Sequence, residues 1–277
     1  MCIRDSLTPE ELERYKERGY LIVRGLFSAD EVTRVLGEAE RDQELLSHTF
    51  DREDGEGGRV RMALWNHPGD DVYGTLSRTA RLVDRAEQIL GGEVYHYHSK
   101  IILKDPEVGG AWAWHQDYGY WYENGLLAPD LVSVFIALDP STRENGCLQI
   151  IPASHRLGRI DHRLTGEQAG ANPDRVTHVV ARLGVRHAEL AAGDALFFHP
   201  NLLHRSDRNA SDRRRWSLIC CYNSAQNEPV LEHHHPGYTP LAKLPDDALL
   251  AASERRMTTQ TSWLDPENDH SAKGGER

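Results

Sequence analysis

The sequence contains few cysteines, and their spacing excludes two common kinds of site. The four cysteines are Cys2, Cys147, Cys220 and Cys221, which fit neither a zinc knuckle nor a disulfide framework. Cys220 and Cys221 are adjacent within an apolar run, and neighbouring side chains of a strand point to opposite faces. We therefore expect buried free thiols, a reducing compartment and a cytoplasmic protein.

The sequence also lacks a long hydrophobic run and an excess of positive charge. No apolar stretch approaches the length of a membrane-spanning helix, and residues 1–6 lack the apolar core of a signal peptide. The net charge of −11 at pH 7 argues against a nucleic-acid-binding surface. We expect neither a membrane nor a nucleic acid as a partner.

The overall amino-acid composition is typical of a globular domain. The chain has 277 residues, of which 39% are hydrophobic and 27% are charged, enough to build a hydrophobic core. Because no internal repeat or linker divides the sequence, we expect one domain over residues 7–262. Residues 1–6 have no evident structural purpose and residues 263–277 look like a frayed tail, so we expect both to be disordered or non-native.

Helix-start signals dominate residues 7–92. Thr8 and Ser28 are each followed by acidic residues in what would be the first turn of a helix. Together with the glycines that follow the last of these segments, they predict helices at residues 8–19, 28–46 and 72–90. Between the helices we expect a short strand at 20–23 and a mobile loop at 49–61.

Residues 93–222 have the pattern of a β protein. Short β-branched or aromatic runs are separated by Gly, Pro, Asn and Asp, which is typical of a sandwich or barrel rather than of alternating parallel units. The predicted strands are residues 93–103, 111–118, 131–138, 147–151, 178–180, 185–190, 195–199 and 216–222. The segment 223–262 is loop-rich, with one short helix expected at 246–256. The fold class is therefore mainly β with flanking helices.

One predicted strand carries two side chains that commonly bind metals, His115 and Asp117. Side chains alternate along a strand, so we expect these two on the same face. One further imidazole would complete a two-His, one-carboxylate face, which leaves positions of an Fe(II) ion open. Two candidates for it, His199 and His204, follow the turn at Gly193-Asp194. His-x-Asp alone is common and is more often an ordinary hydrogen-bonded pair.

An arginine that follows these histidines in the sequence is a candidate for the same site. Arg215 lies eleven residues after His204 and opens the next strand. A buried guanidinium can bind one end of a small dicarboxylate through two hydrogen bonds. Ser206 and Ser217 lie two residues beyond His204 and Arg215, so their hydroxyls could donate to the same carboxylate. They could equally satisfy local backbone groups.

Together these residues resemble the phytanoyl-CoA dioxygenase (PhyH) family of Fe(II)- and 2-oxoglutarate-dependent oxygenases. The resemblance rests on His115-x-Asp117, His204 and Arg215, and on Asn145-Gly-Cys-Leu followed by Pro152-Ala-Ser-His, where the family has Pro-Gly-Ser-His. It implies a double-stranded β-helix, a jelly-roll (cupin-like) core with helices packed on one side. The core would be residues 93–222, between a helical part at 7–92 and a C-terminal extension at 223–262.

The resemblance also implies roles for the site residues. His115, Asp117 and His204 become the ligands of Fe(II), while Arg215, helped by Ser206 and Ser217, binds the distal carboxylate of 2-oxoglutarate. The implied reaction consumes 2-oxoglutarate and O2, releases succinate and CO2, and hydroxylates a substrate. Because Asp117 is present, hydroxylation is favoured over halogenation. His199 is then left with a structural or supporting role.

Candidates for substrate contacts surround these residues. Tyr118 and Trp121 are expected at the barrel mouth, although aromatic residues there could simply be core. His98 and Lys100 share a face of the preceding strand, where His98 could contact 2-oxoglutarate or substrate. An ammonium at Lys100 would suit an anionic substrate, but a rim lysine pointing to water is an equally good interpretation.

Two other features stay open. Lys104 has the same two interpretations as Lys100. The run His233-His234-His235 is interpreted as a loop with incidental metal affinity.

The sequence thus predicts an Fe(II)- and 2-oxoglutarate-dependent dioxygenase that hydroxylates a small, polar or anionic molecule. A zwitterion or anion such as an amino acid or an aminophosphonate suits the aromatic residues and Lys100, whereas the acidic chain does not favour a large CoA ligand. One alternative is a non-catalytic barrel that binds a metal or ligand as a sensor or carrier. Another is a metal hydrolase or isomerase, which has no need of Arg215.

Overall fold

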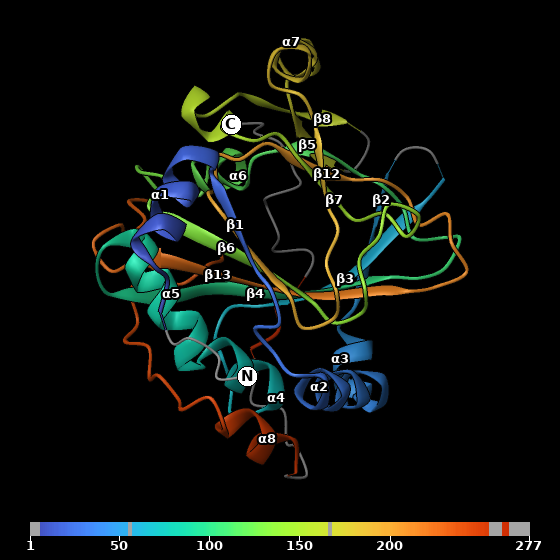
Figure 1. The fold of residues 1–277 in the computed structure, drawn as a ribbon, viewed down its shortest axis with the longest axis vertical. Helices are drawn as coiled ribbons and strands as arrows, with labels where there is room; N and C mark the ends of the chain where they lie inside the picture. Colours follow the sequence, from blue (N-terminus) through green and yellow to red (C-terminus); the bar gives the residue numbers. More distant parts are fainter. Residues whose placement is uncertain (1–5, 55–56, 166–167, 255–261, 266–277) are drawn as a thin grey trace.

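Two antiparallel sheets form the framework of the molecule (Figure 1). The computed structural model describes residues 6–54, 57–165, 168–254 and 262–265. The larger sheet has the strand order β1 (Tyr20–Val23), β11 (Ala195–Phe198), β6 (Leu131–Ala137), β13 (Arg215–Ser224), β4 (Val94–Lys104), β3 (Arg59–Trp65) and β2 (Phe50–Glu53). The smaller sheet has the order β10 (Arg186–Ala188), β7 (Leu148–Ile150), β12 (His204–Ser206) and β5 (Trp112–His115). A separate hairpin pairs β8 (His162–Thr165) with β9 (Gln168–Ala171).

Helices pack against the larger sheet and cap the molecule. They are α1 (Pro9–Arg18), α2 (Ala29–Arg41), α3 (Gln43–Ser47), α4 (Val72–Ser77), α5 (Ala80–Leu90), α6 (Asp117–Trp121), α7 (Pro173–Leu183), α8 (Ala248–Ser253) and the 3-10 helix η1 (Ser154–Leu157). In Figure 1, α2, α3, α4 and α8 lie on one side of the larger sheet, and the smaller sheet and α7 lie on the other. This is the predicted jelly roll with flanking helices.

The first predicted helices follow their start signals. Thr8 and Ser28 form capping boxes at the starts of α1 and α2, and Gly19 ends α1 in the left-handed conformation. The predicted helix 28–46 is divided, because Asp42 has an extended backbone and caps α3. Likewise the predicted helix 72–90 consists of α4 and α5, with Arg78 and Thr79 between them.

Two other predictions are wrong. The segment 49–61 is not a mobile loop: its described residues form β2 and the start of β3, which pair antiparallel. Residues 178–180 are not a strand but belong to α7, where Asn172 accepts a hydrogen bond from the Arg175 N–H and Pro173 opens the helix. This start signal decides the conformation, and the buried residues of α7, Val176 and Val179, have helical spacing.

The described start of the expected C-terminal tail packs against the rest of the molecule. Trp263 forms a β-bridge with Trp65, and its ring stacks on His48 with 5.2 Å between ring centroids. The predicted helix at 246–256 is α8, and residues 255–256 lie outside the described part. The expectations for residues 1–5 and 266–277 also lie outside the described residues.

The core has two large parts, one on each face of the larger sheet. Ile136 belongs to the part that packs against the helices, while its neighbour Phe135 belongs to the part between the sheets, with Phe198 and Trp121. This alternation follows from the period of two along a strand. Cys147, Cys220 and Cys221 are buried and free, as predicted, while Cys2 lies outside the described residues.

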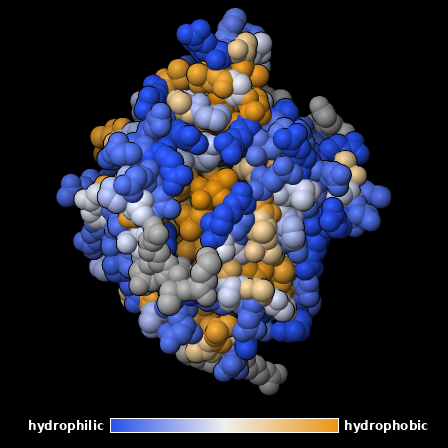
Figure 2. Space-filling model, viewed as in Figure 1, coloured by the Kyte–Doolittle hydropathy of each residue, from blue (hydrophilic) through white to orange (hydrophobic). Residues whose placement is uncertain are grey.

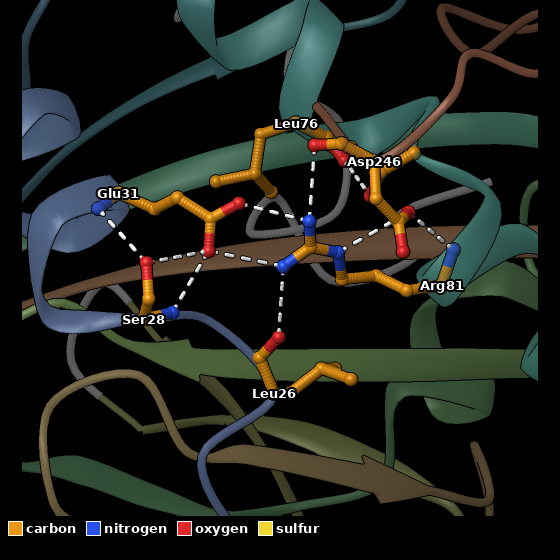
Figure 3. Close-up of polar contacts among 7 residues, drawn as sticks. Leu26, Ser28, Glu31, Leu76, Arg81 and Asp246 are labelled. Atoms are coloured by element: carbon orange, nitrogen blue, oxygen red, sulfur yellow. Dashed lines mark hydrogen bonds and ion pairs between the residues drawn. The ribbon is translucent and has the colours of Figure 1, made fainter. Parts of the chain in front are cut away.

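A buried ion pair joins the helical layer to the C-terminal segment (Figure 3). The Arg81 guanidinium contacts both carboxylate oxygens of Glu31, at 2.8 and 3.0 Å, and donates to the backbone carbonyls of Leu26 and Asp246. Glu31 also accepts from the Ser28 N–H, so the capping box of α2 and the ion pair share one carboxylate. Arg81 and Glu31 are only 4% exposed, so their charges depend on each other.

The face of the molecule in Figure 2 is largely polar. On the face shown in Figure 2, hydrophilic residues predominate, and hydrophobic ones show mainly near the middle and toward the α7 end. Within the described residues, no helix has the length and apolar character needed to cross a membrane.

Candidate metal centre and its pocket

Three buried side chains with metal-binding atoms meet between the two sheets. His115 ends β5 and pairs with His204 at the start of β12. Their Nε2 atoms lie 3.7 and 3.8 Å from Asp117 Oδ1, and the three potential ligand atoms lie within 4.8 Å of one another. In the described part of the chain, no other group of three His, Cys, Asp or Glu residues has this geometry.

Backbone carbonyls set the tautomer of both imidazoles. His115 Nδ1 lies 2.8 Å from the carbonyl of Ala113, and His204 Nδ1 lies 2.9 Å from that of Leu202. A carbonyl only accepts, so each Nδ1 carries the proton and each Nε2 presents a lone pair. Burial lowers the pKa of both imidazoles, and the His204 ring lowers that of His115 further. Both rings are therefore neutral at pH 7, the state that binds a metal.

Asp117 reaches this site by a different route from the one predicted. The strand ends at His115, Gln116 is the N-cap residue, and Asp117 is the first residue of α6. The prediction that His115 and Asp117 share a face of one strand is therefore wrong. Ser133 donates to Asp117 Oδ2 at 2.6 Å, which leaves Oδ1 facing the two imidazoles.

The side chain of Gln116 holds this turn in place. Its amide nitrogen donates to the carbonyls of Gly158 and Asn201, and its amide oxygen accepts from the Ile160 N–H. The Gln116 backbone N–H donates to His162 Nε2 at 3.0 Å. These four hydrogen bonds fix the turn between β5 and α6. The turn therefore directs the side chains of His115 and Asp117 toward the same place, although one belongs to a strand and the other to a helix.

The pocket that contains these three residues is rich in positive charge. Four cationic side chains line it, and the only carboxylate among the described lining residues is Asp117. The cationic residues are Arg52, Lys100, Arg205 and Arg215. Such a pocket, with a divalent cation added, favours anionic ligands.

Arg215 is the most deeply buried of these cations. It is 2% exposed, and burial lowers its pKa to about 10. Its guanidinium lies 5.6 Å from the centroid of the Phe135 ring. Within the described structure, Nε and Nη1 have no hydrogen-bond partner. Buried donors without partners are costly, so the arrangement fits a ligand that brings its own acceptors, such as a carboxylate.

The serines and the lysine near Arg215 differ in their surroundings. Ser206 lines the pocket, and its hydroxyl accepts from Lys104 Nζ at 3.0 Å. Lys104 is fully buried rather than on the rim, and its ammonium also donates to the Asp207 carbonyl. Ser217 is buried and is not among the residues that line the pocket, and its hydroxyl has no partner among the described residues.

Beyond Arg215 and the two serines, the structure places three of the four remaining candidates for ligand contacts in the pocket. His98, Lys100 and Trp121 line the pocket. Tyr118 is outside the set of lining residues, and its hydroxyl donates to the Leu126 carbonyl at 3.0 Å. His199 is also outside the set of lining residues: its Nδ1 accepts from the Asn201 N–H, and its ring packs against His155.

Several residues of the pocket were missed by the sequence analysis, among them His235, Arg52 and Arg205. His235 is 5% exposed and lines the pocket from the C-terminal segment. The run His233-His234-His235 lies in a loop, as interpreted, but no place in the pocket was predicted for its last residue. Sequence position gave no signal for this contact, because its neighbours His98 and Asn66 are remote in the chain. Arg52, from the segment predicted as a loop, was missed for the same reason.

Comparisons with known proteins agree with this geometry. A model of the phytanoyl-CoA dioxygenase (PhyH) family matches residues 15–217. L-proline trans-4-hydroxylase of Streptomyces griseoviridis is 37% identical over 192 residues, which cover 63% of this chain and 72% of that protein. Ectoine dioxygenase of Streptomyces avermitilis is 31% identical over 239 residues, 81% of each chain.

Solved structures share the fold. The apo form of EctD from S. alaskensis superimposes with a TM-score of 0.73 at 24% identity, covering 86% of this chain and 88% of that one. The same enzyme with 2-oxoglutarate and 5-hydroxyectoine gives 0.72 at 22% identity, covering 88% and 91%. The chain belongs to the phytanoyl-CoA dioxygenase family and is an Fe(II)- and 2-oxoglutarate-dependent dioxygenase.

Proposed function

We propose that this dioxygenase hydroxylates a small, polar or anionic organic molecule, with Fe(II) held by His115, Asp117 and His204. The observation that carries the proposal is the pocket itself. It combines three convergent ligand atoms with a buried arginine whose donors lack partners. When bound, Fe(II), 2-oxoglutarate and O2 supply the oxidising chemistry, which yields succinate, CO2 and a hydroxylated product.

Each residue of the chain has a distinct task in this proposal. Arg215 binds the distal carboxylate of 2-oxoglutarate through its guanidinium, and the Ser206 hydroxyl, which Lys104 contacts, lies at the same end of the pocket. Ser133 orients Asp117. Phe135, Ile219 and Phe198 line the pocket with apolar surface, which excludes water and strengthens the interactions of the charged groups.

Lys100 supports an anionic or zwitterionic substrate. Its ammonium lines the pocket, and it makes no hydrogen bond or ion pair with any residue in the described ranges. Two of the relatives are named for L-proline and ectoine, both small and polar. Trp121 and Leu64 add apolar lining for the carbon skeleton.

A screen for succinate tests the proposal. The Fe(II)-loaded protein is given 2-oxoglutarate, O2 and a panel of amino acids, other small zwitterions and anions, with apolar acids and acyl-CoA thioesters as a comparison set. We expect succinate above the substrate-free background with a member of the first panel, and we expect Lys100→Met to reduce it. Stimulation by acyl-CoA thioesters alone would contradict the substrate class.

The same assay separates the enzyme from a sensor or carrier. Slow decarboxylation of 2-oxoglutarate without a substrate, dependent on O2 and abolished in His204→Ala, is the behaviour we expect of the wild type. A protein that binds 2-oxoglutarate but never forms succinate would instead support the non-catalytic barrel.

A further inference from the structure

His235 enters the pocket from outside the part of the chain that matches the family. The match covers residues 15–217, whereas His235 belongs to the loop-rich segment after β13. Its ring stacks on that of His98, with 4.5 Å between centroids and 15° between planes, and lies 4.7 Å from that of Tyr97. The ring is thus held in one orientation at the edge of the pocket.

The hydrogen bonds of Asn66 determine which nitrogen of His235 carries a proton. The amide nitrogen of Asn66 donates to the His234 carbonyl at 2.5 Å. A carbonyl cannot donate, so the amide oxygen of Asn66 must be the atom that faces His235 Nδ1, at 2.9 Å. His235 Nδ1 therefore donates to Asn66.

The other ring nitrogen of His235 is then a hydrogen-bond acceptor. Burial lowers the pKa of His235 well below the ordinary value, and the nearby rings of His98, His234 and His233 and the Lys100 ammonium lower it further. The ring is neutral at pH 7, and Nε2 presents a lone pair. This nitrogen can accept a hydrogen bond from a ligand but cannot donate one.

His98, beside His235, also has unused hydrogen-bonding capacity. Its side chain is 3% exposed and lines the pocket, and its Nδ1 has no partner within the described structure. Lys100 shares the face of β4 with His98. The two imidazoles and the ammonium thus form a polar group of three residues, here called the His98–Lys100–His235 group.

Strand register separates this group from the end of the pocket that contains Arg215. Arg215 pairs with Lys104, whereas Cys221, six residues further along β13, pairs with His98. Six residues of strand span roughly 20 Å, and Lys100, which pairs with Ile219, lies four residues or roughly 13 Å along the strand from Arg215. The inference rests on the proposed function, which gives the Arg215 end to 2-oxoglutarate and leaves the other end for the substrate.

We propose that His235, oriented by Asn66, is a specificity-determining residue that accepts a hydrogen bond from an N–H group of the substrate, while Lys100 binds the substrate's carboxylate. The donor at Lys100 and the acceptor at His235 complement a carboxylate and a protonated amine on one molecule. The preferred substrate class is therefore a small zwitterion such as a free amino acid. A plain carboxylic acid satisfies Lys100 but leaves Nε2 of His235 desolvated without a donor.

Binding of matched ligand pairs tests this assignment. Calorimetry without O2, on protein loaded with Fe(II) and 2-oxoglutarate, compares L-amino acids, including L-proline, with analogues in which carbon or hydrogen replaces the amine; cyclopentanecarboxylate is the partner of proline. We expect at least one amino acid to bind at least ~10-fold more tightly than its analogue, as for one hydrogen bond to a charged group.

Variants then assign that preference to one side chain. His235→Phe keeps a ring that can stack on His98 but removes the acceptor, so the preference should fall to less than about threefold. His235→Gln restores an acceptor oxygen and should recover part of it. Lys100→Met should weaken both members of a pair alike. Glu232→Gln, at an exposed residue of the same segment, is the matched control and should change neither.

The outcomes distinguish this inference from the proposed function. Equal binding of amine and amine-free ligands by the wild type, an undiminished preference in His235→Phe, or no binding of any amino acid to protein that does bind 2-oxoglutarate would each overturn the role of His235. Unchanged 2-oxoglutarate affinity in His235→Phe shows that the variant is folded. Failure of the wild type to bind 2-oxoglutarate would instead overturn the proposed function.

Discussion

Ser133 shows how one hydroxyl can orient the carboxylate of a proposed metal ligand. It donates to Asp117 Oδ2 at 2.6 Å from the neighbouring strand β6, and both side chains are buried. This contact selects Oδ1 as the oxygen that faces His115 and His204. Partners of this kind commonly change metal affinity although they never touch the metal.

Removal of this hydroxyl should weaken metal binding. We expect Ser133→Ala to lower the affinity for Fe(II) about 10-fold, because Asp117 can then rotate away from the two imidazoles. Anaerobic titration with Fe(II) measures the change. Ser141→Ala removes another buried hydroxyl, one without a hydrogen-bond partner among the described residues, and should leave the affinity unchanged. Equal affinities in Ser133→Ala and the wild type would contradict this role.

Residues that the family motif contains were predictable, and other residues that the fold brings together were not. His115 and Asp117 are two residues apart, and Arg215 follows His204 by eleven. The contacts of His235 with Asn66 and His98 join segments that only the folded chain places together. Tyr118 illustrates the reverse: it follows Asp117 directly, yet the helical turn of α6 directs its hydroxyl to Leu126.

At the scale of helices and strands, helix-start signals predicted the observed elements more reliably than hydrophobic runs did. The N-caps of α1 and α2 were predicted, and their capping boxes formed. The β-branched run at 178–180 suggested a strand because the start signal of α7 was overlooked. The start of α6 at Asp117 carries no side-chain cap hydrogen bond, so the sequence contained little to mark it.

The buried ion pair between α2 and α5 should be a main determinant of stability. We expect Glu31→Leu to lower the free energy of unfolding by about 3 kcal/mol, because the Arg81 guanidinium would lose its buried carboxylate partner and keep only the partly exposed carboxylate of Asp246, 3.2 Å from Nε (Figure 3). Urea denaturation followed by circular dichroism measures the loss. Glu13→Leu, which breaks an exposed ion pair with Lys16, is the control and should have little effect. Similar losses in both variants would contradict the account.

At the scale of the whole molecule, many histidines are buried as neutral rings, which makes stability depend on pH. Burial lowers the pKa of His199 to about 4, with His155 adding to the effect. In the unfolded chain this residue regains an ordinary histidine pKa near 6.5. Between these two values the unfolded state binds more protons than the folded state, so stability is complete above about pH 6.5 and is lost as the pH falls toward 4.

His199 should account for a measurable part of this slope. Its Nδ1 accepts from the Asn201 N–H, and an asparagine oxygen can replace that acceptor without titrating. We expect the free energy of unfolding of His199→Asn to fall less steeply between pH 6.5 and 4.5, by up to about 1.4 kcal/mol per pH unit. Urea denaturation of the metal-free protein across this range measures both slopes. Parallel curves for the variant and the wild type would show that His199 does not titrate as described.

The overall architecture was predictable because its pattern is spread over the whole chain, from helix signals to many short strands. The edge hairpin of β2 and β3 was not, since its acidic and glycine-rich sequence resembles a loop. That hairpin contributes Arg52, Val60 and Met62 to the pocket. The chain before residue 93 therefore helps to build the site as well as the helical layer.

The most direct test of the central claim is anaerobic addition of 2-oxoglutarate to the Fe(II)-loaded protein, followed by visible absorption. The account predicts a weak charge-transfer band that saturates with 2-oxoglutarate. The band should be absent in His115→Ala, and Arg215→Met should need at least ~10-fold more 2-oxoglutarate to reach it, because the variant loses a charge-assisted, two-point contact. A wild-type protein without the band, or an Arg215→Met variant that saturates like the wild type, would contradict the account.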